Sequence, residues 1–237
     1  MTTAPATTTL SVRGEAQRTT MPDYAQVSAG VTGTRESAAA AIADVQVRLS
    51  EIVAELRGMG GTVLTADTTR APLTWSAPSV RTQEEYAHNK RTGEHGPTGR
   101  QQASVTLLVV LRDLTLLPDV AAVLTSRDPV DVHQVSWWVD EDNAEWALVR
   151  ADAIRAAVRK GQDYAAALGG SVTSVDHVAD AGLLGGREAS DIGQMAKSMA
   201  FGAAGGGDDL ALDPPPQVLR ATIEARLTAE VSALPER

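Results

Sequence analysis

Between residues 9 and 31 the chain alternates between apolar and polar side chains, the period of two expected for a β-strand with one buried face. In residues 9–17, Leu10 and Val12 alternate with polar neighbours. A turn follows at residues 21–23, and the alternation resumes from Ala25 to Val31. The pattern predicts two strands joined as a hairpin.

Two longer segments instead carry apolar residues at the three- and four-residue spacing of an amphipathic helix. They cover residues 38–59 and 147–168, and both are followed by glycines, which commonly end helices. Asp142 or Asn143 can cap the second helix, because a short polar side chain accepts a hydrogen bond from a free backbone N–H there. A shorter helix is predicted at residues 114–125.

The remaining apolar segments read as strands. They lie at residues 62–79, 101–112, 130–139, 171–179 and 219–231. The 101–112 segment is apolar on both faces, so we expect it to be covered on both sides. Residues 80–100 have no apolar period and contain several glycines, which predicts an exposed hairpin tip.

Together these elements predict an α+β fold in which mainly antiparallel sheet, of about seven strands, packs against two long helices. We expect four segments: a flexible N-terminal tail at 1–8, an α+β core at 9–181, a partly disordered Gly/Pro-rich linker at 182–216, and a terminal strand at 217–233 that completes the domain.

Composition narrows the classes of function. The 237 residues carry 21 basic and 30 acidic side chains, a net charge of −9, which disfavours nucleic-acid and anionic-membrane partners. Cysteine is absent, which excludes disulfides and thiolate chemistry. No apolar run approaches the length that spans a bilayer. The first residues lack a secretion-signal pattern, so we expect a cytoplasmic protein.

Candidate chemistry is sparse. His88 and His95 lie in the expected hairpin tip, where an adventitious metal site is conceivable but ordering a loop is costly. Strand alternation puts His133 on the face of Val135, and His177 on the face opposite Asp176.

The acidic side chains at the start of the second long helix are explained by the favourable field at a helix N-terminus. They are Asp140, Glu141, Asp142 and Glu145. The glycine run at 205–209 lacks the strand and lysine of a phosphate-binding loop. We therefore predict no catalytic, cofactor-binding or metal-binding residues.

Surfaces for contact are better indicated than sites for chemistry. Trp137 and Trp138 are adjacent in a strand, so their rings point to opposite faces; one is expected to meet a helix, and the other lies under a second layer or in a subunit contact. The terminal strand can pair with its own sheet or with a neighbour's edge. The candidate interface or ligand-contact residues are Trp75, His133, Trp137, Trp138, Leu219, Ile223 and Leu227.

Several motifs in combination resemble a known family, the SIMPL-domain proteins, formerly filed as a domain of unknown function. They are LSVRGE at 10–15, MPDYAQVS at 21–28, the alanine-rich first helix, ASVTL at 103–107, RDL at 112–114, VSW at 135–137 and the helix from Arg150 through Gly169. The resemblance spans about residues 9–233.

The resemblance implies an α+β fold and no established catalytic residues. It also implies that relatives described as periplasmic or outer-surface antigens form large ring-like or channel-like oligomers, that a mammalian member associates with a Pelle-like kinase, and that bacterial members are linked to oxidative-stress tolerance. Most bacterial relatives carry a secretion signal, and this chain departs from them in showing none.

Three hypotheses follow. The first is a non-enzymatic, self-assembling scaffold, a homo-oligomer with a stress-related role and no cofactor. The second is a module that binds a small molecule or a protein or peptide partner near Trp75, Trp137 and His133, because an aromatic side chain beside one polar group suits recognition. The third and weakest is a metal-dependent hydrolase.

Overall fold

The computed structural model describes residues 6–88, 95–126, 129–184 and 213–232. The chain divides into two compact units, each drawn from separated parts of the sequence. Unit 1 combines residues 1–21, 140–201 and 216–237, and unit 2 combines residues 22–139 and 202–215.

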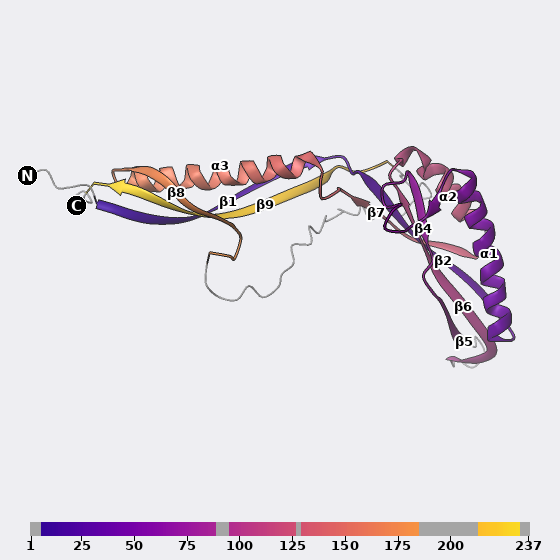
Figure 1. Cartoon of the computed structure of the whole chain (residues 1–237). Coiled ribbons are helices and arrows are strands. Elements are labelled where there is room, and N and C mark those ends of the chain that lie inside the picture. The colour runs from indigo at the N-terminus through magenta and orange to yellow at the C-terminus, as the bar shows by residue number, and fades with distance from the viewer. Residues whose placement is uncertain (1–5, 89–94, 127–128, 185–212, 233–237) are drawn as a thin grey trace, which may run out of the picture. The chain divides into compact units, whose positions relative to one another are not determined.

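Unit 1 is a three-stranded antiparallel sheet with one long helix on it (Figure 1). Its elements are β1 (Ala6–Thr20), α3 (Ala144–Ala167), β8 (Ser171–Asp180) and β9 (Gln217–Val231). The strand order is β1-β9-β8, so the terminal strand occupies the centre of its own sheet. β1 and β9 pair without a register shift from Ala6↔Val231 to Thr20↔Gln217.

The contact between α3 and this sheet is made by small residues. The buried residues of α3 lie four apart: Val149, Ala153, Ala157, Gly161 and Ala165. Gly14 of β1 lies directly beneath them, where an added Cβ would overlap the Ala153 carbonyl oxygen and the Ala157 nitrogen. Likewise, a Cβ on Gly161 would overlap the Leu227 side chain. The helix can therefore lie close to β1 and β9.

Unit 2 is a six-stranded sheet with its main core under α1. Its elements are β2 (Tyr24–Arg35), α1 (Ala38–Gly58), β3 (Thr62–Val63), β4 (Leu73–Ser76), β5 (Val80–His88), β6 (His95–Leu111), the short 3₁₀ helix η1 (Leu114–Leu116), α2 (Leu117–Thr125) and β7 (Val130–Trp138). The order is β3-β4-β6-β2-β7, with β5 also paired to β6; only β3 and β4 are parallel.

The two long helices lie where predicted; α1 begins at the expected residue, whereas α3 begins at Ala144, three residues before the expected 147, and the short helix expected at 114–125 is divided into η1 and α2. Ser37 caps α1 by accepting a hydrogen bond from the Ala40 N–H, and the chain leaves the helix through Gly60 at a positive φ of 81°. Asn143 caps α3, accepting from the Glu145 N–H at 2.9 Å.

The predicted α+β class and mainly antiparallel pairing are confirmed, but the element count was wrong. The described residues form nine strands and three α-helices, not about seven strands and two long helices. The strand expected at 62–79 is two short strands separated by a turn, in which the Thr68 hydroxyl donates to the Val63 carbonyl oxygen and accepts from the Thr65 N–H; Pro72, which cannot donate a ladder hydrogen bond, directly precedes the second strand. β5 replaces the expected tip; it shows no apolar period because both its faces are largely exposed.

Other boundaries also differ from the expectation. Residues 6–8, assigned above to a tail, begin β1. Residues 1–5 and most of the expected linker, 185–212, lie outside the described residues. On β6, Leu107 and Val109 point into the core as predicted, whereas Leu108 and Val110 are only half-buried and lie outside the core cluster. The second covering layer that we expected over them is not seen among the described elements.

The close packing of α3 is testable at Gly14. A Gly14→Ala substitution forces a Cβ against helix backbone, which cannot give way as a side chain could, so we expect a loss of about 1–3 kcal/mol in the free energy of unfolding. Urea denaturation followed by circular dichroism measures it.

Gly58→Ala is the matched control. A Cβ there meets nothing within 4 Å, and alanine favours a helix more than glycine does, so stability should hold or rise. Equal stability of Gly14→Ala and wild type would contradict the close approach of α3.

Candidate functional site

Five of the seven residues predicted for contact are buried within their own unit. Trp75 and Trp137 belong to the core of unit 2. Leu219, Ile223 and Leu227 are buried on β9. Only Trp138, 37% exposed, and the side chain of His133 remain accessible. The opposite-face prediction for the adjacent tryptophans is therefore confirmed, with Trp137 as the packed member.

The prediction for His133 was wrong because β7 contains a bulge. Gln134 pairs with Ser28 and Val132 with Ala29, which leaves His133 as the extra residue. Val132 and Val135 both pack against the core. The imidazole of His133 instead lies over Gly30, its Nε2 2.6 Å from the position a Cβ would take.

A second bulge corrects the expectation for His177. The register of β8 shifts between Val175 and His177, so Asp176 is the extra residue. The Asp176 carboxylate accepts a hydrogen bond of 2.6 Å from the Thr228 hydroxyl. Asp176 thus lies on the polar face of the sheet, the face that also carries Arg226, the partner of His177. Alternation does not separate Asp176 from His177.

The face of the unit 2 sheet opposite the core is called the open face. It holds a stack of three planar groups. Tyr24 and Trp138 are cross-strand partners whose rings stack with centroids 6.4 Å apart and planes at 11°. The Arg112 guanidinium lies 4.9 Å from the Tyr24 ring centroid, and its Nε donates to the Thr69 carbonyl oxygen at 2.7 Å. The stack joins a cation to two aromatic faces.

Three polar side chains and one valine form the next row of the open face. The register aligns Thr74, Val110, Gln26 and Ser136 across four strands. Thr74 is 1% exposed, and its Oγ1 has no hydrogen-bond partner among the described residues. Buried hydroxyls rarely stay unpaired. Thr74 is too buried to contact a ligand directly, so recognition of a planar or anionic group would rest on the stack, where Trp138 is 37% exposed.

Sequence reasoning missed three residues on the side of the sheet away from the core: Tyr24 and Arg112, which are partly exposed, and Thr74, which is buried. The signal was present in the alternation: each sits one residue from an inward-facing neighbour, namely Ala25, Leu111 and Leu73.

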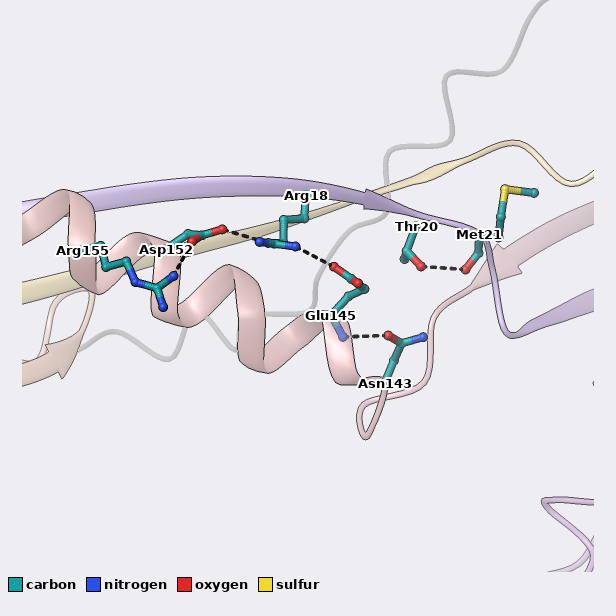
Figure 2. Close-up of polar contacts among 7 residues, drawn as sticks. All are labelled: Arg18, Thr20, Met21, Asn143, Glu145, Asp152 and Arg155. Atoms are coloured by element: carbon teal, nitrogen blue, oxygen red, sulfur yellow. Dashed lines mark hydrogen bonds and ion pairs between the residues drawn. The ribbon is translucent and has the colours of Figure 1, made fainter.

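Unit 1 carries a polar network between β1 and α3 (Figure 2). Arg18 donates through Nε to Asp152 at 2.8 Å and through a terminal nitrogen to Glu145 at 3.3 Å. Arg155 donates to the other Asp152 oxygen at 2.8 Å. The hydrogen bond from Arg18 holds the pKa of Asp152 below its ordinary value, with a smaller contribution from Arg155. These charges fasten the end of β1 to the first turns of the helix.

The described residues offer little for metal or membrane chemistry. No group of three or more histidine, aspartate or glutamate side chains in this part of the chain could hold a metal ion. The backbones of His88 and His95 pair across β5 and β6, but their side chains lie outside the description. None of the described helices is both long and apolar enough to cross a bilayer.

Comparison with protein families identifies a match. The family model described as "SIMPL: Protein of unknown function (DUF541)" matches residues 10–231, nearly the whole chain. No curated protein matches the sequence significantly.

The Arg18 network makes stability depend on pH. The lowered pKa of Asp152 means that this carboxylate contributes stability above the pKa it has in the unfolded chain, and that the contribution is lost as the pH falls through its folded value. We expect Asp152→Asn to lower the Tm at neutral pH and to make the Tm fall less steeply below about pH 4.

Asp163→Asn is the control, because Asp163 lies on the same helix and makes no hydrogen bond or ion pair with a described residue. Thermal melts across an acid pH series give both slopes. Identical slopes for Asp152→Asn and wild type would rule out the network as a source of acid sensitivity.

Proposed function

The chain belongs to the SIMPL family, whose function is unknown, and we propose that it is a non-enzymatic scaffold that works by assembling with copies of itself. The main support is that several large apolar side chains on helices and strands are exposed to solvent. They include Trp138, Leu148, Tyr164, Val175 and Val178. Burying such side chains against another copy gains about 25 cal/mol per Å² of apolar area.

The use of the charged residues supports the same proposal. Arg18, Asp152 and Glu145 tie a strand to a helix, and Arg13 tethers neighbouring strands through Glu224 at 2.7 Å. Such pairs support architecture rather than proton transfer, which needs titratable groups converging on a substrate. The proposal extends to a stress-related role and a cytoplasmic location, in line with the expectations above.

Self-assembly is measured directly by light scattering coupled to size exclusion, over a concentration series. We expect a mass of two or more chains at tens of micromolar, falling towards the monomer on dilution. High salt should change this little if apolar contacts dominate, since salt screens charges and leaves hydrophobic contacts intact. A constant monomer mass up to that concentration would refute the scaffold proposal.

A second candidate function is binding of a planar organic anion or an aromatic side chain of a peptide at the open face. The stack of Arg112, Tyr24 and Trp138 on that face favours it, because it presents a guanidinium group and aromatic rings together. Trp75 and Trp137, which we had expected to contribute, are buried in the core.

Tryptophan fluorescence tests this second function, with 4-hydroxybenzoate as the probe. Saturable quenching that is lost in Trp138→Phe and weakened about tenfold in Arg112→Gln is the expected result. Val63→Ala, an exposed substitution on β3, serves as the control. Absence of saturation with the probe would count against a ligand of this class.

A further inference from the structure

One row of residues on α3 borders the β1 edge of unit 1. It lies one position before each buried residue of the helix and consists of Leu148, Asp152, Ala156, Lys160 and Tyr164. Asp152 bonds Arg18 of β1, and the Lys160 Nζ bonds the Arg13 carbonyl oxygen at 2.8 Å, which places the row over β1. We call it the flank row.

The flank row is self-complementary. Read in either direction it runs apolar, charged, alanine, charged, apolar, and its two charges have opposite sign. In an antiparallel pair of α3 helices related by a two-fold axis at Ala156, each Asp152 meets Lys160 of the second copy. Each Leu148, 43% exposed, meets Tyr164, 50% exposed. The small Ala156 at the axis lets the helices approach.

β1 carries an independent pattern with the same symmetry. Among the described strands, β1 pairs only with β9, so its other edge is open. An antiparallel pair of β1 strands centred on Gly14 places Arg13 opposite Glu15 of the second copy, and Glu15 opposite Arg13. Cross-strand pairs of opposite charge stabilise a sheet. Glu15 makes no direct hydrogen bond to another described residue, and its charge acts on Arg13 of its own strand.

The two symmetry centres coincide on the molecule. Gly14 lies against Ala153 and Ala157, the two residues that flank the level of Ala156. One two-fold axis therefore serves both the strands and the helices.

The spacing is also compatible. Paired strands lie about 4.8 Å apart, and α3 covers both β1 and β9, so two α3 axes would lie about 10 Å apart, the usual distance for packed helices.

We propose that two copies of this chain pair through β1 and the flank row of α3, forming a continuous six-stranded sheet with two antiparallel helices on one face. This inference rests on the proposed self-assembly and names its first contact. On pairing, the Lys160 ammonium leaves the Arg13 carbonyl oxygen of its own chain and pairs with Asp152 of the second copy. The Arg13 carbonyl oxygen then accepts a hydrogen bond from a backbone N–H of the second β1.

The first test uses the absence of cysteine from the chain. With helix axes about 10 Å apart and Cα atoms about 2.3 Å from each axis, the two Ala156 Cα atoms lie about 5 Å apart, within disulfide range. Mild oxidation of Ala156→Cys should give a covalent dimer on non-reducing gels. The control, Arg159→Cys, is exposed on the same helix but outside the flank row and should remain uncrosslinked.

The second test places opposite charges at two positions that only the proposed two-fold symmetry brings together. Leu148→Glu alone should introduce an unpaired acid at the contact and weaken the dimer Kd by about tenfold or more. Tyr164→Lys alone should weaken it similarly. The double variant should restore dimerisation, because the axis brings Glu at 148 next to Lys at 164 of the second copy. Gln162→Glu, which adds the same charge at an exposed position of α3 outside the flank row, is the control and should leave the Kd unchanged.

The outcomes separate this inference from the proposal on which it rests. An assembled wild type with neither crosslinking nor rescue would overturn the β1 and flank-row contact and leave self-assembly standing. A wild type that is monomeric at tens of micromolar would overturn both.

Discussion

The small residues between α3 and the strands beneath it set the geometry of unit 1. Gly14, Ala153, Ala157 and Gly161 leave no room for a further methyl group, so helix and sheet meet almost backbone to backbone. Each side chain in such a contact contributes little stabilising free energy, so the contact must continue along the helix to stabilise the unit. The register of β1 against β9, unbroken from Ala6 to Thr20, supplies that continuity. The two strands come from opposite ends of the chain, so unit 1 requires both ends before it can form.

Periodicity predicted the buried parts of this fold well, because burial is what imposes a period. The α1 and α3 helices, the inward residues of β6 and the division between Trp137 and Trp138 all follow from it. The failures fall where burial is absent or the backbone is irregular. β5 is exposed on both faces and so has no pattern to read. The bulges at His133 and Asp176 invert the alternation, and single residues give no warning of a bulge.

The candidate surfaces could be predicted only in part. The alternation indicated that Trp137 and Trp138 point to opposite faces, but not which residues would join Trp138. Tyr24 and Arg112 are far apart in the chain, and the sheet register brings both to the open face beside Trp138. Arg18, Glu145 and Asp152 are likewise joined only when β1 meets α3. Long-range partners of this kind depend on topology, which local spacing does not determine.

The two edges of the unit 1 sheet differ in a way that bears on assembly. β8 is interrupted by two register shifts, a usual means of preventing edge-to-edge pairing. β1 is regular throughout, and Lys160 covers one of its carbonyl groups. A regular edge of fifteen residues suits a partner strand, whereas the bulged edge does not.

A two-fold contact at β1 uses the same surface on both copies and is complete after two chains. Growth beyond a pair therefore needs a second, different surface. Under the proposed self-assembly, the open face of unit 2 offers such a surface through Trp138, which is 37% exposed, because tryptophan is enriched at the centres of protein interfaces.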